Sequence, residues 1–137
     1  DWSSDVCSSD LDRLSPGVAC GAVVKADGYG VGVTPVSRTL YAAGCRMFFV
    51  ATLEEAITLR GELPEVPIYV LYGVTKGQET AFVHYGLTPI LNTEGQIELW
   101  KRHAAVAGKL LPAMLHVDTG MCRLGLPLEV FEARWGD

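Results

Sequence analysis

A short apolar run that ends on a single lysine is the feature that most constrains this chain. Residues 18–24 are apolar, Lys25 follows them, and Gly28, Gly30 and Gly32 come shortly after. A short apolar run bounded by turn residues predicts a buried strand, and the glycines predict a tight loop after it. Lysine is almost never fully buried unless it is paired or used chemically. Lys25 is therefore the first candidate for chemistry in this sequence.

The rest of the chain alternates between strand-like and helix-like patterns. Strands are predicted at 18–26, 47–51, 67–71, 87–91 and 111–117, and helices at 34–43, 52–61, 76–85, from Asn92 or Thr93 to 107, and from 126 onwards. This alternation, with a repeat of roughly 20 to 25 residues, implies a parallel sheet with right-handed crossovers. Two architectures fit it: an open doubly wound sheet, or the first part of a (β/α)8 barrel of about 250 residues.

Local signals sharpen some of these boundaries. Thr34 is placed to cap a helix that has Pro35 at its first position. Thr52 and Glu55 form the capping-box pattern, in which each side chain bonds the other residue's backbone N–H. Pro89 has no N–H to donate to a neighbouring strand, so the strand at 87–91 is expected to be weak.

Composition limits the classes of function that fit. The chain has 137 residues, of which 49% are hydrophobic and 20% charged, as expected of one soluble globular domain. A formal net charge of −5 argues against a general nucleic-acid binder, which needs a basic face. No apolar run approaches the roughly 18 residues of a membrane span. The four cysteines lack C-x-x-C and zinc spacing, which indicates reduced thiols and no metal site.

A second predicted strand, also expected to be buried, ends in polar residues and a glycine loop. Residues 115–126 read LHVDTGMCRLGL. Arg123 has two interpretations. Its planar guanidinium could bind a carboxylate through two parallel hydrogen bonds, or it could be a solvated loop residue. Asp118 could pair with Arg123 or cap the loop. His116 lies in the strand and is expected to be a hydrogen-bonded core residue.

Lys25 has two interpretations at this point. Its amine could form a Schiff base with a carbonyl compound, which requires the neutral amine that apolar surroundings favour. Alternatively, the side chain snorkels past the sheet edge into solvent. Tyr29 either points its hydroxyl at the same site or covers the rim as a half-exposed aromatic residue.

Two segments together resemble a known family. Residues 22–32, AVVKADGYGVG, are similar to the cofactor-lysine segment of bacterial alanine racemases, and residues 116–125, HVDTGMCRLG, are similar to that family's second signature. Residues 51–56 and 68–73 also fit the family pattern, and the resemblance extends over residues 14–134. Two such segments in the right order, each at a strand end, are far more specific than either alone.

The resemblance implies an α/β fold: a partial, truncated (β/α)8 TIM-type barrel with about five βα units of parallel sheet. Residues 12–137 would be the N-terminal part of a barrel domain that binds pyridoxal 5'-phosphate. The implied activity is racemisation of L-alanine to D-alanine, which supplies cell-wall precursors. The implied enzyme is cytoplasmic and a homodimer at full length.

The same resemblance assigns roles to three residues. Lys25 would bond covalently to the cofactor and act as one of two bases at the substrate α-carbon. Tyr29 would help to hold the cofactor phosphate. Arg123 would contact the cofactor's phenolic oxygen and the substrate carboxylate. The cofactor would serve as the electron sink, while the protein supplies position and proton transfer.

Two differences from the family pattern bear on activity, and a third observation concerns the first residues of the chain. Many members have a carbamylated lysine where this chain has His116, so Arg123 must be held in another way. The family's second catalytic base is a tyrosine in the C-terminal domain of the partner subunit, which this chain does not include, so the chain alone is expected to be inactive. Residues 1–11 have no helical or strand period and resemble a translated sequencing adapter, so we expect them to be a non-native leader.

Two kinds of alternative stay open. One is another member of the same barrel group, either a different amino-acid racemase or a non-catalytic protein that binds pyridoxal phosphate. The other is an α/β module that binds a phosphate ligand without covalent chemistry, in which Lys25 is only a phosphate contact. Neither alternative involves nucleic acid or a membrane.

Overall fold

A row of parallel strands with helices between them makes up the part that the computed structural model describes, residues 18–136; the predicted leader at 1–11 lies outside it. The main sheet contains β1 (Gly21–Val23), β2 (Met47–Val50), β3 (Ile68–Val70), β4 (Thr88–Leu91) and β5 (Met114–Leu115). The helices that connect them are α2 (Lys25–Tyr29), α3 (Val33–Ala42), α4 (Leu53–Glu62), α5 (Glu79–His84) and α6 (Glu94–Ala107). A second sheet pairs β6 (Val117–Asp118) with β7 (Leu126–Pro127), and α7 (Leu128–Trp135) follows.

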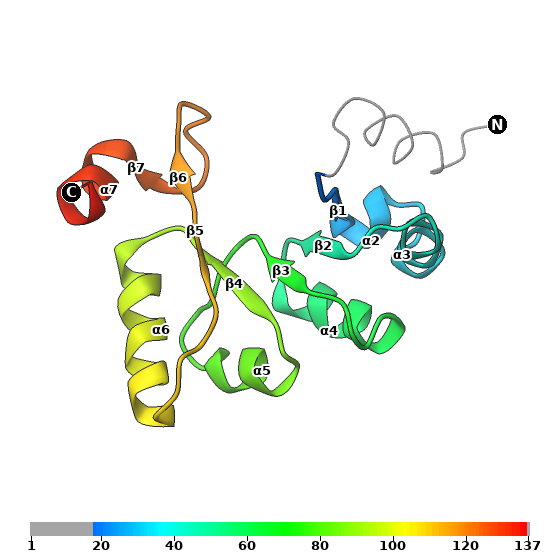
Figure 1. Cartoon of the computed structure of the whole chain (residues 1–137), viewed down its shortest axis with the longest axis horizontal. Coiled ribbons are helices and arrows are strands. Elements are labelled where there is room, and N and C mark those ends of the chain that lie inside the picture. The colour runs from blue at the N-terminus through cyan, green and yellow to red at the C-terminus, as the bar shows by residue number, and fades with distance from the viewer. Residues whose placement is uncertain (1–17, 137) are drawn as a thin grey trace.

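The order of the strands decides between the two predicted architectures. Each strand of the main sheet pairs in parallel with the next one along the chain, so the order is β1-β2-β3-β4-β5. A doubly wound sheet reverses its strand order at a switch point, whereas a (β/α)8 barrel keeps chain order throughout. Helices α3 to α6 follow one another around the outside of the row of strands (Figure 1). The partial barrel is therefore confirmed.

One face of the strands packs against the helices and forms the core. Phe48, Val50, Ile68 and Val70 alternate along β2 and β3 and are completely buried. The residues between them face the other side of the sheet, where Phe49 and Tyr69 stack with ring centroids 4.9 Å apart. From the helix layer, the core receives Ala56, Leu59, Phe82, Ile97 and Trp100. This alternation shows that the sheet has a helix-covered outer face and a distinct inner face.

Several predicted strands differ from those observed. β1 is shorter than 18–26 and is not buried on both faces, since Val23 is 44% exposed and Val24 is the buried residue at its end. β4 is an interior strand despite Pro89, because successive residues of a strand donate to opposite neighbours and one proline removes only one ladder bond. The strand predicted at 111–117 is instead two short pieces, β5 and β6, that are not buried.

Of the two helix caps predicted with a specific residue pattern, one is confirmed and one is wrong. Thr52 and Glu55 form the predicted capping box at the start of α4. The predicted cap Thr34 is wrong, because α3 begins at Val33 and the Val33 N–H donates to Asp27 Oδ1 at 2.7 Å. At α6, Thr93 is the cap and accepts from the Gln96 N–H at 3.2 Å.

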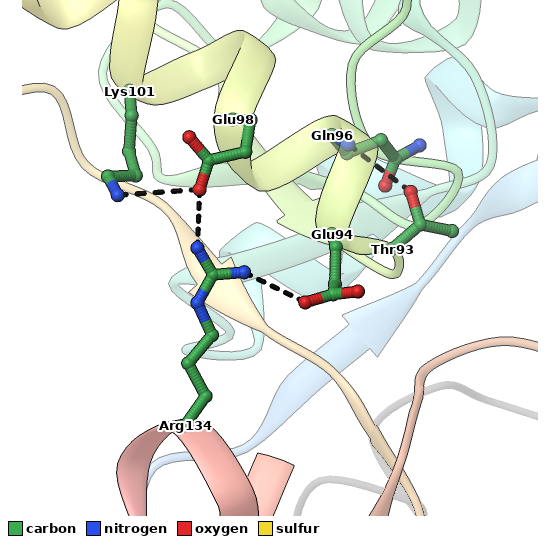
Figure 2. Close-up of polar contacts among 6 residues, drawn as sticks. All are labelled: Thr93, Glu94, Gln96, Glu98, Lys101 and Arg134. Atoms are coloured by element: carbon green, nitrogen blue, oxygen red, sulfur yellow. Dashed lines mark hydrogen bonds and ion pairs between the residues drawn. The ribbon is translucent and has the colours of Figure 1, made fainter. Parts of the chain in front are cut away.

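The last segment, β7 and α7, is anchored to α6 by charge. Leu126–Pro127 forms a strand rather than the start of the predicted helix. Figure 2 shows Arg134 of α7 reaching two carboxylates of α6, with contacts of 2.9 Å to Glu94 and 2.5 Å to Glu98. Lys101 approaches the same Glu98 oxygen at 3.4 Å. The pKa of Glu98 is lowered, chiefly by the hydrogen bond from Arg134. The two contacts of Arg134 link α7 to α6 on the surface of the molecule.

Two further observations concern the cysteines and the helices of the described residues. Their cysteines, Cys20, Cys45 and Cys122, are free thiols. Across residues 18–136, none of the helices combines the length and the apolar character that crossing a membrane requires.

Arg60 closes the amino-terminal edge of the sheet. Its guanidinium donates to five backbone carbonyls, those of Leu63, Pro64, Val66, Tyr85 and Gly86, at 2.8 to 3.2 Å. These carbonyls belong to the loops that enter β3 and β4. A charged donor shared among several carbonyls is worth more than a neutral pair, and its loss leaves acceptors without partners.

Replacing Arg60 by methionine is expected to lower the free energy of unfolding by about 2 kcal/mol, because methionine keeps the apolar stem but offers no donor. The measurement is urea unfolding of the full-length gene product. Arg102→Met is the matched control, since Arg102 is an exposed arginine of α6. Equal stability of the two variants would contradict the proposed role of the guanidinium.

Candidate active site

The carboxyl ends of the strands bring the chemistry-bearing residues to one edge of the sheet. Lys25 follows β1, Tyr72 follows β3, Asn92 follows β4 and His116 follows β5. Because all these strands are parallel, the residues after them share the same edge, where ligands bind in both barrels and open α/β sheets. Arg123 reaches this edge from the loop between β6 and β7.

A pocket of about 400 Å³ lies at this edge. Its lining consists of Lys25, Leu71, Tyr72, His116, Met121, Arg123 and Leu124. The structure thus brings together two of the three predicted site residues, Lys25 and Arg123. The third, Tyr29, is 63% exposed and is not among the lining residues. Within residues 18–136, Arg123 forms no ion pair.

The turn that follows Lys25 has an unusual backbone. Ala26 and Asp27 both have φ 52° and ψ 50°, and Tyr29 has φ 58°. Residues with a Cβ rarely adopt this left-handed conformation, which costs each of them about 1 kcal/mol. The turn is held by backbone bonds, including Gly30 N–H to Ala26 O at 2.9 Å, and by the side chains of Asp27 and Glu55. Strain of this kind is concentrated at functional sites.

A buried asparagine joins the ends of three strands. Asn92 is 4% exposed, and its amide donates to Leu71 O at 2.8 Å and to Ile90 O at 2.9 Å. Its Oδ1 lies 2.8 Å from His116 Nδ1, so the predicted hydrogen bond of His116 is present. The prediction of a core residue within a strand is wrong, because His116 lies between β5 and β6 and is half-buried. The N–H of Asn92 donates in turn to Gln96 Oε1 at 2.8 Å. This network fixes the His116 ring beside the pocket.

Gln96 and a glycine complete the network beneath the pocket. Gln96 Nε2 donates to Tyr72 O at 2.8 Å, which ties the end of β3 to the start of α6. Gly73, with φ 73°, leaves room for this contact, because a Cβ there would lie 2.6 Å from Gln96 Oε1 and 2.7 Å from Ile90 O. No side chain fits at this position without moving backbone.

The loop that carries Arg123 is organised by Asp118. Its Oδ1 accepts from Gly120 N and Cys122 N, both at 3.0 Å. Of the two predicted roles for Asp118, loop cap or partner of Arg123, the structure shows the loop cap. Gly125 allows the end of the loop to pack closely against its beginning at Asp118, because a Cβ at position 125 would lie only 2.7 Å from Asp118 N. Arg123 is thus positioned through the backbone of its loop.

Comparison with known proteins agrees with this geometry. The family described as "Alanine racemase, N-terminal domain" matches residues 9–136. The chain belongs to this family. Relatives include the catabolic alanine racemase of Agrobacterium fabrum (48% identity over 123 residues, 89% of this chain and 32% of that protein). The alanine racemase of a Methylobacterium species is 49% identical over 116 residues, 85% of this chain and 32% of that protein. The chain spans about a third of the length of these curated relatives.

Solved structures give the same result. Alanine racemase from Bartonella henselae with covalently bound pyridoxal phosphate superposes with a TM-score of 0.88 at 38% identity, covering 94% of this chain and 38% of that one. A histidine racemase from Leuconostoc mesenteroides superposes with a TM-score of 0.78 at 27% identity, covering 91% of this chain and 34% of that one. The chain therefore has the fold of the alanine racemase N-terminal domain.

Sequence reasoning missed two residues of this alanine racemase domain that organise the site. Glu55 was expected only to cap a helix, yet it also accepts a hydrogen bond from the residue after Lys25. Asn92 was expected only as an alternative helix cap, yet it links three strand ends. The signal for Asn92 is its position as a polar residue directly after an apolar strand. Glu55 has no comparable signal, because its second contact joins segments far apart in the sequence.

The Asp118 cap predicts a specific pH dependence. Bonds from Cys122 N–H and Gly120 N–H hold the pKa of Asp118 below its ordinary value of 3.8. The carboxylate therefore contributes stability that is complete above the unfolded pKa and is lost as the pH falls through the lowered folded pKa. Asp118→Asn should lower the free energy of unfolding near neutral pH, with a difference from the unmodified protein that vanishes in acid.

Urea unfolding across this pH range measures the difference. Glu132→Gln is the control, because Glu132 is exposed on α7 and its neutralisation should cost little at any pH. An Asp118→Asn effect that stays constant into acid would contradict the charge-based cap.

Proposed function

We propose that this chain is the cofactor-anchoring part of a pyridoxal-phosphate-dependent alanine racemase, which interconverts L- and D-alanine. The observation that carries the proposal is the meeting of Lys25 and Arg123 in one pocket at the carboxyl edge of the strands. The named activity of the curated relatives and the covalently bound pyridoxal phosphate of the Bartonella enzyme support it.

The pocket residues fit such a cofactor. A volume of about 400 Å³ lies in the usual range for small-molecule sites. Lys25 offers a primary amine that can bond covalently to an aldehyde, and it is half-buried beside apolar Leu71 and Leu124. Arg123 adds a second cation with a fork of donors for anionic oxygens. An amine and a guanidinium in one concave site suit a ligand that is both an aldehyde and an anion.

The residues of this chain then have distinct tasks. When bound, the cofactor supplies the electron sink that makes the substrate α-hydrogen acidic. Lys25 anchors the cofactor and moves a proton at one face of the α-carbon. Arg123 binds the substrate carboxylate and a cofactor oxygen, and the Asp118 loop orients it. Tyr29 is proposed as a phosphate contact. The second base lies outside this chain.

His116 has a supporting role in this proposal. It lines the pocket together with Arg123, and the family resemblance places it where many members carry a carbamylated lysine. Its ring is held by Asn92, whose own amide is committed to two backbone carbonyls. We assign His116 to shaping the wall of the pocket next to Arg123, while the loop backbone holds Arg123 itself.

The proposal extends to the whole protein. Residues 12–137 are proposed to be the N-terminal part of the pyridoxal-phosphate-binding barrel domain, after a non-native leader at 1–11. The full-length protein is proposed to be a cytoplasmic homodimer that acts on free alanine. A racemase for another amino acid is the second candidate, because a histidine racemase shares the fold at 27% identity. A panel of amino acids tested on the full-length gene product separates the two.

Covalent trapping tests the role of Lys25. The full-length gene product is incubated with pyridoxal phosphate, reduced with borohydride, digested and analysed by mass spectrometry. The label is expected on the peptide that contains Lys25, and Lys25→Ala should reduce it to background. Lys76→Ala, a change at an exposed lysine between β3 and α5, should leave the label intact. Undiminished labelling of Lys25→Ala would reject covalent anchoring and favour a simple phosphate contact.

A separate test concerns the 137-residue chain alone. It is expected to form no measurable D-alanine from L-alanine, because it spans only about a third of the length of its racemase relatives. In addition, among the described residues β5 pairs with a neighbouring strand on one side only. Met114 and Leu115 of β5 are correspondingly 43% and 41% exposed. A chiral assay of the purified chain with added pyridoxal phosphate measures this. Formation of D-alanine above the rate of a Lys25→Ala control would contradict the expectation.

A further inference from the structure

The backbone immediately after Lys25 is held in a conformation that its own residues disfavour. Ala26 lies in the left-handed region, with φ 52° and ψ 50°, and Asp27 has the same angles. Glycine adopts this conformation freely, but alanine meets a clash between its Cβ and the backbone. Bonds within the turn offset part of this cost, among them Gly30 N–H to Ala26 O at 2.9 Å. The peptide between Lys25 and Ala26 is the part closest to the candidate anchor, and a contact from outside the turn reaches it.

Glu55 supplies such a contact. Its Oε1 accepts from Ala26 N at 2.8 Å, across 29 positions of sequence. Its Oε2 accepts from Ala51 N at 2.7 Å and from Thr52 N at 3.3 Å. Both oxygens of one carboxylate are thus bound to backbone N–H groups of two different strand ends, those of β1 and β2. Hydrogen bonds to an ionised acceptor are about twice as strong as neutral ones.

The position of Glu55 makes this contact stiff. The residue lies in the first turn of α4, its side chain is part of the capping box with Thr52, and it is half-buried. The carboxylate is also stabilised by the positive end of the helix dipole. The backbone of Glu55 is held in α4 and its carboxylate is held by hydrogen bonds, so the side chain has little freedom. The Ala26 N–H that donates to this carboxylate is therefore fixed in direction. The direction of this N–H sets the plane of the peptide that begins at Lys25.

We propose that Glu55 is a positioning residue for Lys25: it holds the Lys25–Ala26 peptide in the orientation that directs the lysine side chain into the pocket shared with Arg123. This inference rests on the proposed function. A carboxylate of the neighbouring βα unit thereby controls the anchor without touching the cofactor or the substrate.

The test compares the rate at which Lys25 is covalently trapped in variants of the full-length gene product. Glu55→Gln keeps the shape of the side chain but has one acceptor oxygen, so it cannot serve Ala26 and Ala51 together. Glu55→Asp keeps the charge but is one methylene too short to span from α4 to Ala26. Both should slow borohydride trapping of pyridoxal phosphate at Lys25 about tenfold, as expected when a reacting group is misplaced.

Thr52→Ala is the matched control for the loss of the helix cap. It removes the hydroxyl that accepts from Glu55 N at 3.3 Å and leaves the Glu55 carboxylate in place. Trapping in Thr52→Ala should stay within about twofold of the unmodified protein, even though a lost cap lowers the unfolding temperature. Hydrogen exchange without added cofactor gives a second readout: the Ala26 amide should exchange faster in both Glu55 variants and not in Thr52→Ala.

The outcomes separate this inference from the function on which it rests. Trapping at Lys25 that is normal in both Glu55 variants, or slowed equally in Thr52→Ala, overturns the role of Glu55 and leaves the cofactor assignment standing. Unchanged exchange of the Ala26 amide in the Glu55 variants also overturns it. An unmodified protein that is never trapped at Lys25 overturns the cofactor assignment and this inference together.

Discussion

Parallel pairing of the strands in chain order is the constraint on which everything else in this molecule depends. It places the residue after each strand at the same edge, so segments that are far apart in the sequence contribute to one pocket. It also leaves one face of the sheet for the helices, which the alternation of Phe48, Val50, Ile68 and Val70 fills with apolar side chains. Site and core are therefore two consequences of the same pairing.

The two edges of the sheet use polar side chains differently. At the amino-terminal edge, Arg60 satisfies five backbone carbonyls and stabilises the loops around it. At the carboxyl edge, Asn92 and Gln96 satisfy backbone groups beneath the pocket, while left-handed residues after Lys25 keep the backbone strained. This division between a stabilising edge and a functional edge is typical of barrel enzymes.

Two carboxylates order the backbone beside the two cations of the site, and neither carboxylate forms an ion pair with Lys25 or Arg123. Glu55 binds the backbone next to Lys25, and Asp118 binds the backbone of the loop that carries Arg123. An ion pair with Lys25 or Arg123 would occupy the donors that an anionic ligand needs. Binding backbone N–H groups instead orders each turn and keeps the charged heads available to the pocket.

The sequence by itself determined the order of elements, the alternation of strands and helices, the capping box at Thr52 and Glu55, and the two segments that identify the family. These follow from local propensity and from spacing along the chain, which neighbouring residues decide. Strand ends shifted by a few residues, and the cap of α3 was misjudged, because Asp27 competes for the Val33 N–H. The predicted burial of β1 and of the strand at 111–117 also failed, since burial depends on what covers a strand.

Only the tertiary structure decided the rest. The alternation of strands and helices left the barrel and the open sheet as alternatives, and the family resemblance implied the barrel. The strand order confirmed it, because strand order is a property of pairing between distant segments. The tertiary structure brought Lys25 and Arg123 into one pocket and left Tyr29 outside its lining. It gave Glu55 its contact with Ala26 and His116 its contact with Asn92. Each of these depends on how separate βα units pack together, and no periodicity within one unit carries that information.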